Sequence, residues 1–400
     1  MTSHTTATRS HARFFTARFI GAAVVAGALV TGSVLTASVA SAAPAPGVPE
    51  VTAGLDYVAL GDSYSAGLGL TPSTGLPTPE CGQSAVNFPH QVAAAYGLNL
   101  TDVTCSGAET GDITVDSQFG NISPQIAALS ADTDVVTLTI GGNDLGFTDV
   151  IQTCLAQTAD GPLLFPNQDG VFLPNCNAGY AAEGVDRLAL KISAQVAPSL
   201  ATTYAAIAAA APNAKVFVVG YPSIFPATIP AAGCFTTLGS APNTFPFTTV
   251  DTAYLHSVEV KLDAAIQSAT QTAGFTYVPS FASSFGHDAC VTDGTAYVNG
   301  VLLGDGGLQP GTLHPNTLGA TFLTDSVSTA LNAAFPAPIV VPTPPTPPTP
   351  PVASGPAAVT PTPALANTGL DGGLVSGGLA LAVLLLVGGA AVTVARRKAA

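Results

Sequence analysis

Basic residues are scarce in this chain. Its 400 residues, enough for two or three domains, include 10 Lys and Arg against 24 Asp and Glu, for a formal net charge of −14. Residues 43–368 hold only four basic residues against 23 acidic ones, a net charge of about −19. Because phosphate contacts need clustered Lys and Arg, this scarcity excludes nucleic acid as the main partner. It also argues against an anionic membrane surface as the docking site. The apolar fraction of 47% excludes a disordered chain.

Several cofactor and metal motifs are also missing. No Cys-x-x-Cys pair exists, so neither a zinc ribbon nor a thioredoxin-like site is supported. The glycines at 67 and 69 do not complete a Gly-x-Gly-x-x-Gly fingerprint, and no phosphate-loop Lys is present. No three or four ligand residues recur at a metal-binding spacing. We therefore predict neither a metal nor a cofactor.

The N-terminal 42 residues have the pattern of a secretory signal peptide. Three Arg residues precede an apolar stretch from Phe19 to about Leu35, and Ala40-Ser41-Ala42 is a small-x-small cleavage site. The alternative is an uncleaved anchor helix. The pattern predicts export.

The C-terminus has three parts in a fixed order. Residues 336–364 are rich in Pro, Thr and Ala, a composition that favours an extended polyproline linker. The pentapeptide Leu-Ala-Asn-Thr-Gly occupies residues 365–369. Residues 374–395 are apolar or small and long enough to span a bilayer, and the basic tail at 396–398 would stay cytoplasmic.

This order resembles the cell-wall sorting signal of Gram-positive bacteria, in the LAxTG variant. The resemblance implies that a sortase cuts between Thr368 and Gly369 and joins the protein to peptidoglycan. The alternative is a plain C-terminal membrane anchor. We therefore expect a secreted protein attached to the cell wall, with a membrane-spanning helix before processing.

Residues 50–335 have the pattern of one α/β domain. Short apolar, β-branched runs alternate with helical stretches, which is typical of βαβ units and a mainly parallel sheet. The predicted strands are 57–60, 98–104, 134–140, 215–219 and 275–278, and the predicted helices are 84–96, 185–211, 252–273 and 316–334. Ligands of such folds bind beyond the carboxyl ends of the strands, so the residues after each strand are the candidates.

Three strand ends and one histidine carry candidate chemistry. Ser63 follows the first strand in Gly-Asp-Ser, where a hydroxyl on a glycine turn can act as a nucleophile or merely cap a helix. Gly107 follows the second strand and can bring a backbone N–H close to a ligand, although a plain turn explains it equally. Asn143 follows the third strand in Gly-Gly-Asn-Asp and can donate to an oxyanion or form a turn. His314 lies in a His-Pro pair just before the last helix.

These four blocks, in this order, resemble the SGNH (GDSL-type) hydrolase family, and especially its secreted actinobacterial lipases and esterases. The resemblance covers about residues 55–333 and implies a flavodoxin-like three-layer α/β/α sandwich. It implies that Ser63 is the nucleophile and His314 the general base. It also implies an oxyanion hole formed by the N–H groups of Ser63 and Gly107 and the Asn143 side chain.

One position departs from the family pattern. Most members have an acidic residue three positions before the histidine, but here that position is Gly311. The resemblance to actinobacterial esterases with a Ser–His dyad implies that the Gly311 carbonyl orients His314. Asp305 is the alternative third member.

The resemblance implies an extracellular carboxylic ester hydrolase that acts on an ester substrate, with acyl lipids favoured. We expect a monomer whose other partners are the sortase and peptidoglycan. The alternatives are a carbohydrate O-acetyl esterase of the same fold and a non-catalytic binding module displayed on the wall.

Six cysteines fit the exported location, because an even count in a secreted domain indicates disulfides. Six cysteines allow 15 pairings. The resemblance to actinobacterial lipases favours the sequential one, which pairs Cys81 with Cys105, Cys154 with Cys176 and Cys234 with Cys290.

Overall fold

The computed structural model describes residues 53–335. The predicted signal peptide (1–42), linker (336–364), sorting pentapeptide (365–369) and membrane span (374–395) lie outside the described residues. No helix within 53–335 is long and apolar enough to cross a bilayer.

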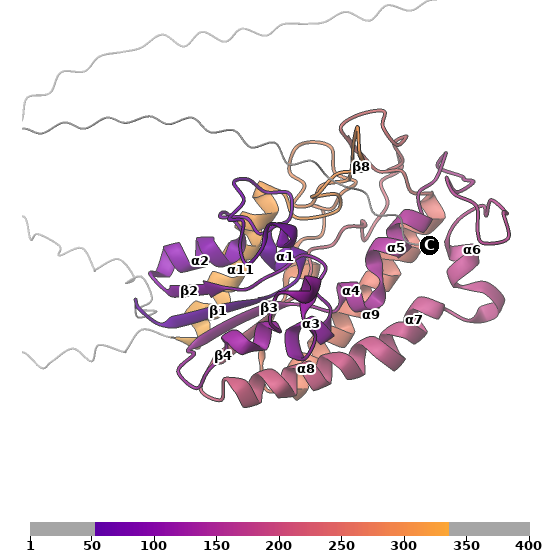
Figure 1. Ribbon diagram of the computed structural model, residues 1–400. Coiled ribbons are helices and arrows are strands. Elements are labelled where there is room, and N and C mark those ends of the chain that lie inside the picture. Colours follow the sequence, from indigo (N-terminus) through magenta and orange to yellow (C-terminus); the bar gives the residue numbers. More distant parts are fainter. Residues whose placement is uncertain (1–52, 336–400) are drawn as a thin grey trace, which may run out of the picture. The chain divides into compact units, whose positions relative to one another are not determined.

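A five-stranded parallel sheet forms the centre of the described residues (Figure 1). Its strand order is β2-β1-β3-β4-β6, the order of flavodoxin-like folds. The inner strands β1, β3 and β4 are buried almost throughout, which explains their continuous apolar runs, whereas the edge strand β2 has alternately exposed residues. The strands are β1 (Asp56–Gly61), β2 (Asn99–Asp102), β3 (Val135–Thr139), β4 (Lys215–Val219) and β6 (Thr276–Val278).

Helices cover both faces of the sheet. In β1, Tyr57 and Ala59 point to one face and Val58 and Leu60 to the other, and each pair belongs to a separate apolar core. The first core packs the sheet against α2 (Phe88–Tyr96) and α11 (Thr317–Ala334), and the second packs it against α8 (Ala197–Ala210) and α9 (Thr249–Thr272). Figure 1 shows α2 and α11 on one side of the strands and α8 on the other. The predicted three-layer α/β/α fold is confirmed.

Local capping explains where the structure differs from the predicted helix limits. The helix predicted from residue 84 begins at Phe88, because the Asn87 side chain accepts from the N–H of His90 at 3.0 Å. Similarly, α9 begins earlier than predicted because the Thr248 hydroxyl accepts from the N–H of Asp251 at 2.9 Å. The remaining helices are α1 (Ser63–Ala66), α3 (Thr110–Thr114), α4 (Gly142–Leu145), α5 (Phe147–Thr153), α6 (Asn177–Tyr180), α7 (Arg187–Lys191) and α10 (Ser280–Ser283), and a π-helical segment (Ile192–Val196) joins α7 to α8.

Long loops lie between these elements, and three disulfides connect them. The pairs are Cys81–Cys105, Cys154–Cys176 and Cys234–Cys290, the same sequential order as predicted. A small antiparallel sheet of β5 (Asn243–Thr244), β7 (Val301–Gly304) and β8 (Gly307–Leu308) lies in the later loops. The last of these strands precedes the loop that carries His314.

Candidate active site

Ser63 lies on a tight turn between β1 and α1. Gly61 ends the strand with φ of 130°, and a Cβ at this position would lie 2.6 Å from the Thr139 carbonyl oxygen, so the turn requires glycine. Asp62 caps α1 by accepting from the N–H of Tyr64 at 3.0 Å. Ser63 is therefore the first residue of a short helix at the carboxyl edge of the sheet, with 8% of its surface exposed.

The structure brings His314 to Ser63 across 251 positions of sequence. The imidazole Nε2 lies 2.7 Å from Ser63 Oγ, and Nδ1 lies 2.7 Å from the Thr312 carbonyl oxygen. A carbonyl can only accept a hydrogen bond, so in the neutral imidazole Nδ1 carries the proton and Nε2 is free to accept from Ser63. Burial lowers the pKa of His314, although the hydrogen bond to Thr312 opposes the shift. The imidazole is therefore held in its basic form.

The predicted role of the Gly311 carbonyl is wrong. That oxygen accepts from the backbone N–H of His314 at 3.1 Å and from Asn299 Nδ2 at 3.0 Å. Leu313, between Thr312 and His314, has φ of 55°, and this left-handed conformation turns the imidazole back onto the Thr312 carbonyl. The orienting carbonyl thus lies two residues before the histidine instead of three.

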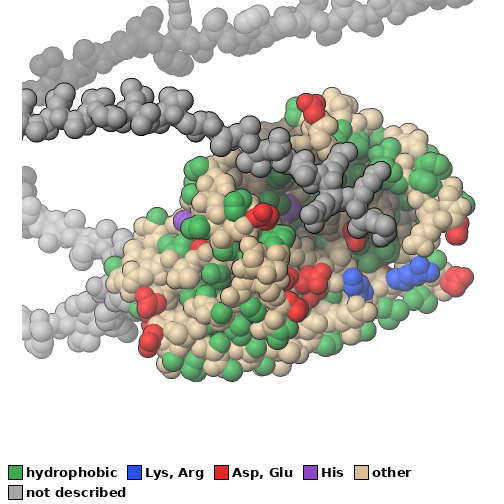
Figure 2. Space-filling view, viewed as in Figure 1, with side chains coloured by type: hydrophobic (Ala, Val, Ile, Leu, Met, Phe, Trp, Pro, Cys, Tyr) green, Lys and Arg blue, Asp and Glu red, His purple; other side chains and the backbone are tan. Residues whose placement is uncertain are grey.

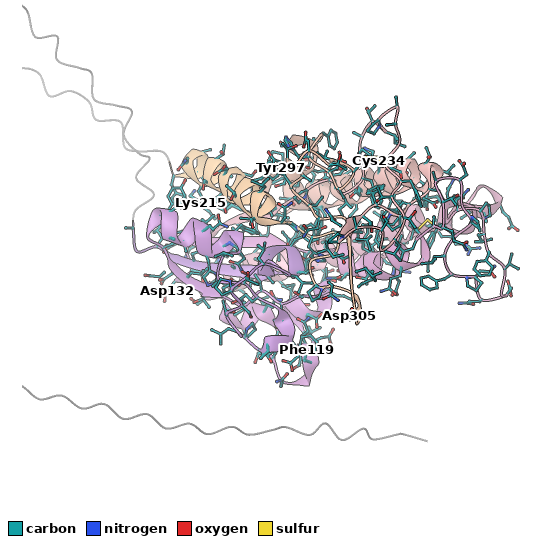
Figure 3. The ribbon with its side chains drawn as sticks, turned by 90° about the horizontal axis from the view of Figure 1, so that it is seen from above. Phe119, Asp132, Lys215, Cys234, Tyr297 and Asp305 are labelled. Carbon is teal, nitrogen blue, oxygen red and sulfur yellow. A yellow bond between two sulfur atoms is a disulfide. The ribbon has the colours of Figure 1, made fainter. Side chains whose placement is uncertain are left out.

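The alternative third member, Asp305, is also absent from the site. It is exposed in the turn between β7 and β8 (Figure 3). Within residues 53–335, the imidazole nitrogens of His314 have Ser63 and Thr312 as their hydrogen-bond partners, and neither partner is a carboxylate. The described site is a Ser–His pair oriented by the main chain.

The candidate oxyanion donors lie on turns that follow β1, β2 and β3. Asn143 is in α4, and its Nδ2 donates to the Ala108 carbonyl at 3.0 Å, which joins its turn to the one that carries Gly107. Within the described residues, the N–H groups of Ser63 and Gly107 have no hydrogen-bond acceptor. Gly107 itself is exposed, with φ of 84°. These donors are free to bind a ligand, and one N–H of the Asn143 amide remains available as well.

Two further side chains, Asp144 and Gln118, fix the Gly107 turn. The Asp144 carboxylate accepts from the backbone N–H of Thr110 at 3.1 Å and from the Thr110 hydroxyl. On the other side, Gln118 Nε2 donates to the Ser106 carbonyl at 2.8 Å. The turn that carries Gly107 is therefore held from two directions.

The sequence analysis missed two side chains that connect these turns. Asp62 is 2% exposed, and its carboxylate accepts from the hydroxyls of Tyr221 and, at 2.8 Å, of Thr139. Burial raises the pKa of Asp62 to about 6, although the hydrogen bonds from Tyr221, Thr139 and Tyr64 oppose the rise. Tyr221 follows the end of β4, so inspecting every strand end, including that one, would have found it. Asp62 stands inside the Gly-Asp-Ser motif itself.

A cavity of about 330 Å³ opens beside the Ser–His pair. Ser63, Asn143 and His314 line it, whereas Gly107 does not. Figure 2 shows this face of the molecule hollowed, with hydrophobic side chains around the hollow. The apolar part of the cavity wall comes from several elements and includes Leu68, Phe147, Ile151, Ile224, Leu262 and Phe281.

Comparisons with known proteins identify the family of this chain. Residues 59–322 match the GDSL-like Lipase/Acylhydrolase family. Lipase 2 of Streptomyces coelicolor is 39% identical over 272 residues, which cover 68% of this chain and 83% of that protein. Among solved structures, the extracellular lipase of Streptomyces rimosus has a TM-score of 0.52 at 27% identity, and phospholipase A1 of Streptomyces albidoflavus has a TM-score of 0.51 at 26% identity. These two matches cover 69% of this chain in each case, and 100% and 99% of the solved chains. The chain belongs to the GDSL-like lipase/acylhydrolase family and is a carboxylic ester hydrolase, as its sequence predicted.

Proposed function

We propose that this esterase acts through an acyl-enzyme formed on Ser63. His314 Nε2 takes the hydroxyl proton as Ser63 Oγ attacks the ester carbonyl, and then gives that proton to the departing alcohol. Water, deprotonated by the same imidazole, next attacks the acyl-enzyme and releases the carboxylic acid. The observation that carries the proposal is the 2.7 Å contact between Ser63 Oγ and His314 Nε2, with Nδ1 committed as a donor to a carbonyl.

The oxyanion of the tetrahedral intermediate binds to the N–H groups of Ser63 and Gly107 and to the Asn143 side chain. Support comes from the two unoccupied N–H groups and from the hydrogen bond that joins Asn143 to Ala108. Donors fixed before the reaction need no reorganisation when the negative charge develops, which makes them effective in catalysis.

We further propose that the natural substrates are acyl lipids. An acetyl group would leave most of a 330 Å³ cavity with apolar walls unfilled, whereas an acyl chain buries its methylene groups there at about 0.8 kcal/mol each. The names of the Streptomyces relatives point the same way. Nitrophenyl acetate, butyrate, octanoate and palmitate, assayed beside acetylated xylan, test this proposal. A preference for acetate and xylan would instead support the carbohydrate esterase.

The site proposal is tested by replacing its two reacting side chains. Ser63→Ala and His314→Ala should each lower kcat by several orders of magnitude, because nucleophile and base act as a unit. Ser65→Ala is the matched control, since Ser65 lies in the same helix but its hydroxyl bonds Thr139 at 2.7 Å. Wild-type activity in Ser63→Ala would refute the mechanism, and a wild-type protein without esterase activity would favour a binding module.

The proposed location is outside the cell, with the protein attached to the cell wall. Three disulfides in the described residues support an oxidising compartment. Attachment by a sortase rests on the sequence of residues 365–400 alone. Mass spectrometry of wall fragments should find peptidoglycan joined to Thr368. Thr368→Ala should move the enzyme from the wall fraction to the membrane fraction, because the predicted span at 374–395 would then not be removed. Recovery of unmodified Thr368 followed by Gly369 in mature protein would exclude that processing.

A further inference from the structure

Tyr221 connects the two turns that carry Ser63 and Asn143. The three residues follow β4, β1 and β3, and β3 lies between the other two strands in the sheet. The Tyr221 hydroxyl donates to the carboxylate of Asp62, next to Ser63, and accepts from the N–H of Gly142, next to Asn143, at 3.1 Å. A single hydroxyl oxygen therefore bridges the immediate neighbours of the nucleophile and of an oxyanion donor.

The Asp62 end of this bridge is rigid. Its carboxylate also accepts from the N–H of Tyr64 at 3.0 Å and from the Thr139 hydroxyl at 2.8 Å, inside a nearly closed environment. The Tyr221 ring packs edge-on against Tyr64, with the ring centroids 4.9 Å apart. The bridging hydroxyl is therefore fixed by both its ring and its acceptor.

The Gly142 end depends on the bridge. Gly142 is the first residue of α4, and an N–H at that position has no partner within its own helix. The preceding residue, Gly141, offers no side chain that could cap the helix. Without the Tyr221 hydroxyl, the α4 turn would lose this connection to the Ser63 turn.

We propose that Tyr221 is a positioning residue that sets the distance between the Ser63 turn and the Asn143 side chain, and so aligns the oxyanion hole with the nucleophile. This inference rests on the proposed function of Ser63 and Asn143. Its physical basis is that a displacement of about 1 Å in a reacting geometry can cost a factor of about 100 in rate. Tyr221 also lines the cavity, so a role in substrate binding is the competing explanation.

The test uses the full-length protein with Tyr221→Phe, which keeps the ring and removes the bridge. We expect kcat for nitrophenyl butyrate to fall about 10- to 100-fold, with KM within about twofold, because the contact acts in the transition state. If Tyr221 acts through Asn143, the double variant with Asn143→Ala should lose less than about threefold beyond Asn143→Ala alone. If Tyr221 acts independently of Asn143, the losses in kcat of the two single variants should instead multiply in the double variant.

A second variant perturbs the same contact from the other side. A Cβ on Gly142 would lie 3.3 Å from the Tyr221 hydroxyl, so Gly142→Ala should shift this contact by a few tenths of an ångström and lower kcat even with Tyr221 intact. Tyr57→Phe is the matched control, because Tyr57 is a buried tyrosine whose hydroxyl bonds Thr137 at 2.7 Å in the body of the sheet. Its kcat should match the wild type.

The outcomes separate the two proposals. Wild-type kcat in Tyr221→Phe, a raised KM with unchanged kcat, or fully multiplying losses with Asn143→Ala would each overturn the positioning role while leaving the Ser–His mechanism in place. If Tyr221→Phe does not fold, an unchanged kcat in Gly142→Ala overturns it instead. Activity that survives Ser63→Ala would overturn both proposals.

Discussion

Replacing Asp305 by Asn tests whether a main-chain carbonyl is enough to orient His314, the proposed general base. In a triad, a buried carboxylate holds the imidazole and stabilises the imidazolium that forms during the reaction. Here Nδ1 lies 2.7 Å from the Thr312 carbonyl, and Asp305 is exposed on a hairpin turn. Asp305→Asn removes one negative charge and keeps nearly the same shape.

The two mechanisms predict effects of very different size. The interaction free energy between an exposed charge and a neighbouring charged group is at most about 1 kcal/mol. Removing such a charge should therefore change kcat by about fivefold or less. Neutralising a triad acid costs about 10⁴ in kcat, or about 5.5 kcal/mol. In the structure Asp305 is an exposed charge and not a buried triad acid, so we expect Asp305→Asn to lower kcat less than tenfold.

The assay is steady-state hydrolysis of nitrophenyl butyrate at pH 8, where His314 is neutral. Ser63→Ala measures the background without a nucleophile, and Asp293→Asn controls for the loss of one exposed acid from another loop. A drop in kcat of about 10⁴ in Asp305→Asn alone would show that this carboxylate reaches His314 in the working enzyme, and the dyad would have to be abandoned.

Three other predictions follow from the same geometry. Asn143→Ala should lower kcat about 10²- to 10³-fold, as expected for loss of one oxyanion donor, and an unchanged kcat would remove Asn143 from the oxyanion hole. Because burial lowers the pKa of His314 and only its neutral form can accept a proton, kcat/KM should fall toward acid pH with a midpoint below 6.5; a midpoint above 6.5 in a pH–rate profile would contradict this. The double variant Cys81→Ala/Cys105→Ala should lose about 3.5 kcal/mol of unfolding free energy in the chain-entropy model for a loop of about 25 residues, and denaturant titration showing no loss would refute the estimate.

The fold was predictable because the same sequence pattern, a short apolar run, marks each inner strand. The inner strands of a parallel sheet are buried on both faces, so each appears as an uninterrupted apolar run, and the runs at 134–140 and 215–219 became β3 and β4. Helix limits were less predictable because single side chains decide them. Asn87 delays the start of α2, and Thr248 advances the start of α9, through hydrogen bonds that a periodicity pattern does not contain.

The sheet topology made the candidate residues at the strand ends predictable, but not the hydrogen bonds that connect them. Carboxyl ends of parallel strands meet at one edge, which explains why Ser63 and Asn143 line one cavity. The choice between the carbonyls of Gly311 and Thr312 depends on the φ of Leu313, a non-glycine residue in the left-handed region. Such a conformation is imposed by the surrounding fold and leaves no signature in the sequence.

The network that connects the turns also indicates how an acidic domain can bury a carboxylate beside Ser63, its proposed nucleophile. Asp62 has no cationic partner within residues 53–335, and its carboxylate is stabilised instead by the hydroxyls of Tyr221 and Thr139 and by the N–H of Tyr64. A cation beside Asp62 would place a positive charge near His314 and disfavour the imidazolium that forms in the proposed mechanism when Ser63 gives up its proton. Neutral donors avoid that conflict, and because each donor belongs to a different strand end, satisfying the carboxylate also aligns the turns.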